Sequence, residues 1–295
     1  MLSVLIATYN MQRELPRTLL SALPALQRQV SGLEYEIIVI DNGSPVPLEL
    51  DGFAEPLART QVRLIRIDPA VARPSPVFCI NEAALRHAKG DKLLICIDGA
   101  RMFSSHVVRR TIDLLDRYEN AVTFVGSRHL GPKVQMLSVH EGYCQEAEDV
   151  LLSGIDWKRD VDLLFGSSVW AGAHVLSCAF VQNESNAIGI ARANWIRLGG
   201  YNEGFTRPGG GLCNLELFNR LRADRSLICV SLLGEATFHQ VHGGAATSNL
   251  GYARESLGEH RDATSRDYGF EPGRVLFDIG QDIGRADFAK RICLA

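Results

Sequence analysis

SVLIATYN (residues 3–10) is the first of three short apolar runs that decide the fold, and the others are YEIIVIDNGS (35–44) and KLLICIDGAR (92–101). Each run is rich in aliphatic residues, is too short for a typical helix, and shows no clean alternation of apolar and polar positions. This pattern is typical of strands that are buried on both faces of a parallel sheet. The three runs therefore predict an α/β protein with a mostly parallel sheet flanked by helices.

Polar side chains follow each of these runs at its carboxyl end. They are Thr8, Tyr9 and Asn10 after the first run, Asp41 and Asn42 after the second, and Asp98 and Arg101 after the third. Open α/β sheets bind ligands at this edge, because the carboxyl ends of parallel strands meet there. We therefore expect Asp41 and Asp98 to border one crevice that binds a nucleotide.

Composition and charge exclude several functional classes. A net charge of −3 argues against a broad nucleic-acid-binding face, and no run of about 18 apolar residues predicts a membrane span. The seven cysteines contain no CxxC pair, which favours a reduced protein with buried thiols over a disulfide framework or a zinc site. The first expected strand begins at Ser3 and leaves no room for a signal peptide. We expect a cytoplasmic protein, at most peripheral to the inner face of a membrane.

The segments between the apolar runs predict alternating helices and strands. The first helix lies between two of the buried strands and makes a βαβ unit, for which a right-handed crossover is expected. The expected elements are helices over 11–30, 77–89 and 104–118, the last capped by Ser104 or Ser105, and strands over 61–67 and 121–127.

The pattern changes after residue 128. Residues 129–170 are polar, acidic and aromatic, and they predict an insertion or a lid. Later expected elements are a strand, short helix and Gly-Gly turn over 187–203, a helix over 214–224, a strand over 226–238 and a partly helical tail. We divide the chain into a nucleotide-binding half (1–127), an acceptor and catalytic half (128–249) and a C-terminal tail (250–295).

Six short motifs occur in a fixed order along residues 1–245. They are the first two apolar runs, NEAALRHAKGDKLLICIDGAR (81–101), LGGYNEGF (198–205), NLELFNRLR (214–222) and FHQVHGG (238–244). In this order they resemble the inverting glycosyltransferases of family 2, which have the GT-A fold. The resemblance implies transfer of a sugar, with inversion, from a nucleoside diphosphate sugar, and we expect a UDP-sugar. A glycan or a lipid-linked glycan is the acceptor that the analogy suggests.

The catalytic motifs depart from the family at two places. The DxD metal motif keeps only its first acid, Asp98, because Ala100 stands where the second is expected. The family's catalytic Glu-Asp pair aligns with Cys213 and Asn214, and an amide cannot act as a base. Asn214 therefore marks the position of the base, and Glu216 is the nearest carboxylate that could substitute for it.

Neutralising the leaving diphosphate normally requires a divalent cation, Mn²⁺ or Mg²⁺, and Asp98 is the candidate ligand. His239 or His242 could complete the site, which would favour Mn²⁺ because imidazole is the softer ligand. These two histidines face opposite sides in an extended strand and converge only in a turn. Arg101 offers another route, since a guanidinium can neutralise phosphate directly. The structural alternatives are that Asp98 caps its loop, Arg101 forms a surface salt bridge and the histidines are structural.

The nucleotide itself has five further candidate contacts, Thr8, Tyr9, Asn10, Asp41 and Asn81. The resemblance assigns Asp41 to the base or ribose, and its structural alternative is an Asx-turn with Gly43 and Ser44. Tyr9 could stack on the base or be a buried strand-end residue. Asn81 could touch the nucleotide, brace the metal loop or be a satisfied polar group of its helix.

Two functions of different classes remain open from the sequence. The first is a glycosyltransferase that uses a nucleoside diphosphate sugar. The second is a catalytically degenerate nucleotide-sugar-binding protein or partner subunit, which the missing acids at positions 100 and 214 suggest.

Overall fold

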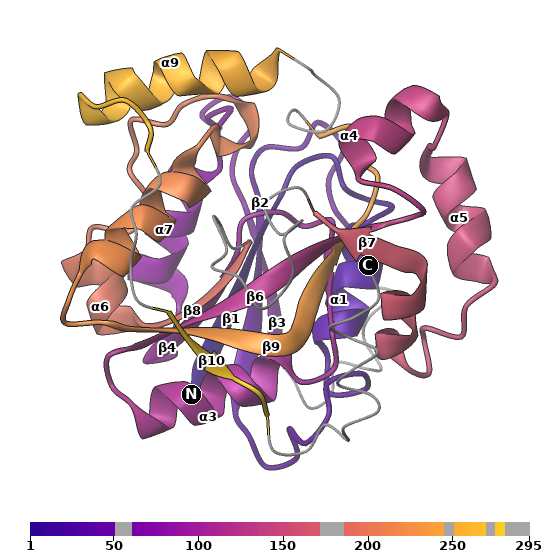
Figure 1. Ribbon diagram of the computed structural model, residues 1–295, viewed down its shortest axis with the longest axis horizontal. Coiled ribbons are helices and arrows are strands. Elements are labelled where there is room, and N and C mark those ends of the chain that lie inside the picture. The colour runs from indigo at the N-terminus through magenta and orange to yellow at the C-terminus, as the bar shows by residue number, and fades with distance from the viewer. Residues whose placement is uncertain (51–60, 172–185, 245–250, 270–274, 281–295) are drawn as a thin grey trace.

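A mixed β-sheet forms the centre of the protein in the computed structural model (Figure 1). The structure describes residues 1–50, 61–171, 186–244, 251–269 and 275–280, except for the side chain at position 253. Among these residues the strand order is β10-β9-β6-β8-β4-β1-β2-β3, with β5 paired to β9 and β7 paired to β6.

The described strands are β1 (Leu2–Thr8), β2 (Tyr35–Asp41), β3 (Gln61–Arg66), β4 (Lys92–Cys96), β5 (Arg101–Phe103), β6 (Ala121–Leu130), β7 (Ser168–Trp170), β8 (Ala187–Ala191), β9 (Ile228–His239) and β10 (Val275–Asp278). The described α-helices are α1 (Leu15–Ala22), α2 (Val77–Glu82), α3 (Val107–Arg117), α4 (Gln135–Ser138), α5 (Gln145–Ser153), α6 (Arg192–Arg197), α7 (Cys213–Ala223) and α9 (Tyr252–Thr264). Shorter helical turns are η3 (Ala83–His87), η4 (Val139–Glu141), η5 (Val161–Ser167) and η7 (Pro208–Gly210).

The three apolar runs form the parallel part of the sheet, as the sequence predicts. β1 pairs in parallel with β2 and with β4, and every residue of β1 and β2 is buried. Burial on both faces explains why these strands lack alternation. β8 runs antiparallel between β4 and β6, so the sheet as a whole is mixed.

Helices cover both faces of the sheet and make two separate cores. On one face, Val4 and Ile6 of β1 pack in a cluster with residues of α1 and α3. On the other, Leu5 and Ala7 pack in a cluster with residues of α2 and α7. Successive side chains of a strand point to opposite faces, which is why one strand contributes to both cores.

Two expected helices differ in detail from those in the structure. α1 ends at Ala22 because Leu23 takes an extended conformation (ψ 157°) before Pro24, which disfavours helix at the preceding residue. The helix expected over 77–89 is α2 followed by the π-helical turn η3.

The predicted serine caps of α3 are wrong. The N-cap residue of α3 is His106, which makes no capping bond through its side chain. The Ser104 hydroxyl donates to Glu235 at 2.5 Å, and the Ser105 hydroxyl donates to Asp162. Both hydroxyls are therefore engaged by residues distant in sequence rather than by the helix they precede.

Residues 129–170 form α4, η4, α5, η5 and β7, and they pack against the sheet through a third apolar cluster that includes Trp157, Phe165 and Phe238. α5 is also tied to the start of α1, where Arg13 contacts the carboxylates of Glu148 at 3.3 Å and Asp149 at 2.8 Å. The predicted insertion is thus an ordered part of the fold.

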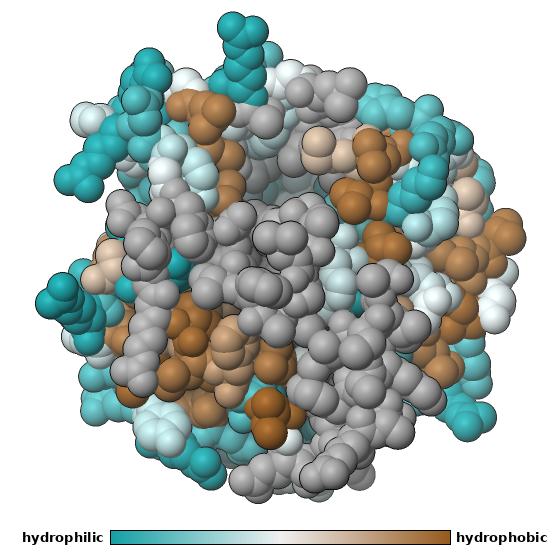
Figure 2. Space-filling view, viewed as in Figure 1, coloured by the Kyte–Doolittle hydropathy of each residue, from teal (hydrophilic) through white to brown (hydrophobic). Residues whose placement is uncertain are grey.

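The structure also bears on the predictions about membrane spans, the surface and the cysteines. No helix among the described residues is both long and apolar enough to cross a membrane. The apolar side chains visible in the space-filling view lie in separate patches among hydrophilic ones (Figure 2). Four of the five described cysteines are buried and no disulfide joins any of the five, while Cys178 and Cys293 lie outside the described residues.

Candidate functional site

A cleft of about 720 Å³ opens at the carboxyl ends of the parallel strands. Its walls come from segments far apart in the sequence, because β1, β2, β4, β8 and β9 all have an end near it. The cleft is lined by eight of the residues that the sequence singles out as site residues: Thr8, Tyr9, Asn10, Asp98, Arg101, Asn214, His239 and His242.

One end of the cleft is formed by the loop after β1. Tyr9 is 51% exposed there, so the alternative of a buried strand-end tyrosine is wrong. Asn10 has a positive φ of 54°, and its N–H donates to the Ser44 hydroxyl at 2.9 Å. The Thr8 hydroxyl is buried without a hydrogen-bond partner, although it borders the cleft. A ligand with polar atoms would satisfy that hydroxyl.

Asp41 does not line the cleft, and our expectation that Asp41 and Asp98 both border it is only half met. The side chain of Asp41 is fully buried, and its Oδ1 accepts from the backbone N–H of Ser44 at 3.0 Å. Asp41 therefore bonds its own turn as the structural alternative expects, but three residues on and not two as in an Asx-turn. Its neighbours Asn42 and Gly43 line the cleft in its place, while Asp41 Oδ2 has no hydrogen-bond partner.

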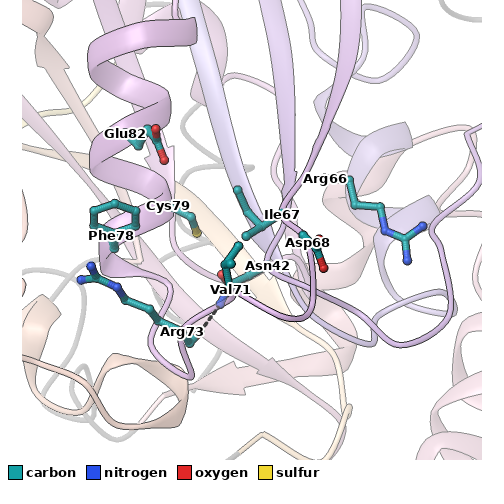
Figure 3. Close-up of a pocket in the computed structure, with 9 residues that line it drawn as sticks. All are labelled: Asn42, Arg66, Ile67, Asp68, Val71, Arg73, Phe78, Cys79 and Glu82. Carbon is teal, nitrogen blue, oxygen red and sulfur yellow. Dashed lines mark hydrogen bonds between the residues drawn. The ribbon is translucent and has the colours of Figure 1, made fainter.

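A second pocket of about 410 Å³ lies beside the cleft and shares Asn42 and Arg73 with it (Figure 3). The amide of Asn42 donates to the backbone carbonyl of Arg73 at 2.7 Å, and the Arg73 guanidinium lies 4.0 Å from the centre of the Phe78 ring. These contacts hold the chain segment that separates the two pockets.

Asn81 is not in the cleft. Its amide pairs with both backbone groups of Tyr201, donating to the carbonyl at 2.8 Å and accepting from the N–H at 2.9 Å. This is the satisfied polar group that the sequence left open as an alternative. Gly200 is required beside it, because a Cβ there would lie 2.3 Å from the Asn81 amide oxygen.

The other end of the cleft holds Asp98, His239 and His242, whose potential ligand atoms all lie within 4.8 Å of one another. Asp98 Oδ2 is 3.0 Å from Nε2 of His239 and 3.7 Å from Nε2 of His242, and the two Nε2 atoms are 3.1 Å apart. β9 ends at His239. The chain then turns, which is why residues three apart converge instead of facing opposite sides.

Gln135 orients the His239 ring. Its Nε2 donates to the His239 carbonyl at 2.9 Å, so its Oε1 is the atom that faces His239 Nδ1. An amide oxygen only accepts, and Nδ1 therefore carries the proton and Nε2 the lone pair. Two electron-rich atoms, His239 Nε2 and Asp98 Oδ2, thus face each other at 3.0 Å, an arrangement that a cation would stabilise.

The charges in this cluster also suit a cation. Burial raises the pKa of Asp98, but the nearby His242 and Arg101 oppose burial, and the pKa lies well below its ordinary value. Burial lowers the pKa of His239 to about 4, and the charge of Arg101 adds to this effect. Asp98 is therefore ionised and His239 neutral at pH 7, which are the forms that bind metal ions.

Arg101 is a buried partner of this cluster rather than a surface residue. It is 8% exposed, its Nε lies 3.3 Å from Asp98 Oδ2, and its Nη1 donates to Ser127 at 2.7 Å. Asp98 also accepts from the N–H of Ala100 at 3.0 Å, so it shapes its own loop as well as facing the cleft.

The two candidate catalytic residues are placed differently. Asn214 lines the cleft, accepts from the Tyr201 hydroxyl at 2.8 Å and donates to Asn186 at 2.9 Å. Glu216 is not among the residues that line the cleft, and it forms an ion pair with Arg220. The carboxylate expected to substitute for the missing base is therefore engaged elsewhere.

Sequence reasoning missed Gln135, Asn186 and Tyr201 as parts of this site. None lies in a motif of charged or metal-binding residues that could have identified it, except that Tyr201 belongs to the LGGYNEGF turn. The three consecutive glycines Gly209, Gly210 and Gly211 all have positive φ. The Gly211 N–H donates to the Tyr252 hydroxyl at 3.0 Å, so α9 holds this turn at the rim.

Comparison with known proteins matches the N-terminal part of the chain to one family. Residues 3–141 match the model of glycosyl transferase family 2. No curated protein sequence is significantly similar to the chain.

Solved structures resemble the chain at low sequence identity. The crystal structure of TarS from S. aureus superposes with a TM-score of 0.50 at 13% identity, covering 89% of this chain and 40% of TarS. A TarS fragment in complex with UDP-GlcNAc gives 0.50 at 13% identity and is covered over 67% of its length. GalNAc-T7 with UDP, GalNAc and Mn²⁺ gives 0.51 at 15% identity, with 91% of this chain and 52% of that one covered. The chain thus spans about half or less of the compared TarS and GalNAc-T7 chains, and it shares their GT-A fold.

Proposed function

We propose that this chain, whose residues 3–141 form a glycosyltransferase family 2 domain, transfers a sugar from a nucleoside diphosphate sugar to an acceptor. We take the nucleotide to be UDP and the stereochemical outcome to be inversion, as the family resemblance implies. The observation that supports the proposal best is the cluster of Asp98, His239 and His242 at one end of a cleft whose other end is built from the ends of β1 and β2.

The nucleoside fits the end of the cleft formed by the loops after β1 and β2. Tyr9 offers an exposed ring on which a base can stack, and Thr8 and Asn42 offer polar groups. Asp41 would act from behind this wall by fixing the loop of Asn42 and Gly43. The residues that we propose for the nucleoside are therefore Thr8, Tyr9, Asn10 and Asn42.

The diphosphate fits the other end. Asp98, His239 and His242 would hold a divalent cation, and one carboxylate with two imidazoles favours Mn²⁺ over Mg²⁺. When bound, such an ion neutralises the diphosphate and makes it a better leaving group. Arg101 contributes a fixed positive charge beside Asp98 that also stabilises a departing phosphate. Gln135 keeps the His239 lone pair directed at the cluster.

A second candidate function is favoured by the acceptor side of the cleft. Asn214 cannot accept a proton, and Glu216 is paired with Arg220. Neither of these two candidate residues is thus poised to deprotonate an acceptor. A nucleotide-sugar-binding protein without turnover, or a partner subunit, is the function that this observation supports.

Turnover assays separate the two functions. Purified protein would be incubated with UDP-sugars and Mn²⁺, and release of UDP measured with and without glycan or lipid-linked acceptors. A glycosyltransferase releases UDP, and Asp98→Ala abolishes the release. UDP binding with no release by any donor would establish the binding protein instead. The anomeric proton coupling of a transferred or hydrolysed sugar, measured by NMR, reports inversion.

Calorimetry separates the two ways of neutralising the diphosphate. If the cation does so, Mn²⁺ raises the affinity for UDP, and Asp98→Asn removes that gain. If affinity is indifferent to Mn²⁺ but falls in Arg101→Ala, the guanidinium is responsible.

A further inference from the structure

Asn186 has an amide group that the fold leaves available at the cleft. The residue is 6% exposed and borders the cleft, and its Nδ2 has no hydrogen-bond partner. A buried amide donor without a partner is unusual in a folded protein, because leaving such a group unpaired is unfavourable. This donor is therefore available to a molecule that enters the cleft.

A chain of hydrogen bonds orients that amide. The Tyr201 hydroxyl donates to Asn214 Oδ1 at 2.8 Å, and Asn214 Nδ2 donates to Asn186 Oδ1 at 2.9 Å. Each carbonyl oxygen of the chain is occupied by a donor, so the group that remains at its end is the NH₂ of Asn186. Successive bonds of this kind also polarise one another, which strengthens the last donor.

The start of this chain is rigid. The backbone N–H and carbonyl of Tyr201 are both bound to the Asn81 side chain, and its ring packs edge-on against Trp195 with the ring centres 5.3 Å apart. The direction of the Asn186 amide is therefore set by the packed interior and not by the loop on which Asn186 lies.

The position of Asn186 in the sheet indicates which part of a substrate it would meet. It immediately precedes β8, whose first residue, Ala187, pairs with Cys96 at the end of β4. Asn186 thus lies beside the segment that carries Asp98. Because β8 and β1 flank β4 on opposite sides, Asn186 lies on the side of β4 that faces away from the end proposed for the nucleoside. A molecule that runs from nucleoside through diphosphate to sugar would reach Asn186 with its sugar.

We infer that Asn186 donates a hydrogen bond to a hydroxyl of the donor sugar, and that Tyr201 and Asn214 position it for this contact. The inference rests on the proposed nucleotide-sugar function. It assigns Asn186 as a residue that distinguishes UDP-sugar from UDP. Because an NH₂ group only donates, the sugar atom that it recognises is an oxygen with a free lone pair.

Calorimetry in Mn²⁺ with UDP and with UDP-glucose, UDP-galactose, UDP-GlcNAc and UDP-GalNAc tests the inference. In Asn186→Ala and in Asn186→Leu, which keeps about the size of the side chain without its polar atoms, the Kd of the tightest-binding UDP-sugar is expected to rise about three- to tenfold, the loss of one hydrogen bond. The Kd of UDP is expected to stay within about twofold, which also shows that the variants are folded. Tyr201→Phe is expected to show a smaller rise with the same selectivity for UDP-sugar.

A matched control is Asn194→Ala, which removes an asparagine of α6 whose side chain bonds the Glu119 carbonyl outside the cleft. Unchanged UDP-sugar affinity in both Asn186 variants would overturn the inference, as would an equal loss for UDP and UDP-sugar. Failure of the wild-type chain to bind UDP would instead refute the proposed function.

Discussion

The two ends of the cleft are built in different ways. The end proposed for the nucleoside comes from the loops after β1 and β2, two adjacent strands that are connected through α1. The end that carries Asp98 also draws on Gln135 after β6, Asn186 before β8 and His239 at the end of β9. The first end is local in sequence, and the second exists only when four distant segments meet.

The difference teaches where each kind of residue can be recognised. A strand that ends in polar residues identifies a ligand-binding edge directly, since topology alone brings neighbouring strand ends together. A metal ligand contributed by a turn, or an amide that orients such a ligand, carries no comparable signal in the sequence. Variants at the two ends should accordingly fail in different ways.

Asp98→Ala should give the largest effect. The substitution removes the only carboxylate of the Asp98, His239 and His242 cluster, and turnover of a UDP-sugar is expected to fall at least about a hundredfold. The measurement is UDP release at saturating Mn²⁺. Asp113→Asn, an exposed carboxylate paired with Arg109, is the control and should retain full activity. Equal activity of Asp98→Ala and wild type would show that this end is not the reaction centre.

Gln135→Ala tests whether an orienting residue far away in sequence matters as much as the structure indicates. Without the amide, His239 Nδ1 loses its partner, and Mn²⁺ affinity is expected to fall about 10- to 100-fold. Titration of Mn²⁺ followed by calorimetry measures this. Gln61→Ala on the exposed edge strand β3 should leave the affinity unchanged. Wild-type Mn²⁺ affinity in Gln135→Ala would mean that His239 is not a ligand.

Tyr9→Ala probes the local end. Loss of a stacking surface for the base is expected to weaken UDP about tenfold, with the same factor in the presence and absence of Mn²⁺. The parallel measurement on Tyr118→Ala, an exposed tyrosine at the end of α3, should show no change. A loss that appears only with Mn²⁺ would place Tyr9 at the wrong end of the cleft.

Glu148→Gln should have the smallest effect on binding, and it should change the stability of the fold instead. Burial raises the pKa of Glu148 to about 7, although the Val241 N–H, Arg13 and Arg17 oppose it. The folded state therefore holds a proton that the unfolded state releases between about pH 4.5 and about pH 7. In this range the free energy of unfolding falls as the pH rises, by at most about 1.4 kcal/mol per pH unit.

Urea unfolding at a series of pH values checks this expectation. The difference in unfolding free energy between wild type and Glu148→Gln should change across that range, because the amide does not titrate. Glu141→Gln, an exposed carboxylate of the same segment, should follow wild type at every pH. A constant difference for Glu148→Gln would show that its carboxyl titrates alike in the folded and unfolded chain.

The parts that could be predicted are those with local causes. The length and apolar content of the runs around Val4, Ile38 and Leu94 predicted that they are buried strands. Asp98 was recognised because it follows one of them. Predictions about the partner or role of a single polar side chain were less successful. Ser104 was expected to cap α3 but bonds Glu235, and Glu216 was expected near the reaction but pairs with Arg220.

The sequence by itself determined the α/β architecture, the edge of the sheet at which the cleft opens and the presence of Asp98 there, since these depend on hydrophobic patterning within short segments. Only the tertiary structure decided that His239 and His242 converge, that Gln135 selects a tautomer and that Asn186 ends a hydrogen-bond chain. The reason is that a hydrogen bond or a metal ligand is specified by the relative position of two atoms. In this chain that position is set by how the segments pack in three dimensions, as it is for Gln135 and His239, which are 104 residues apart.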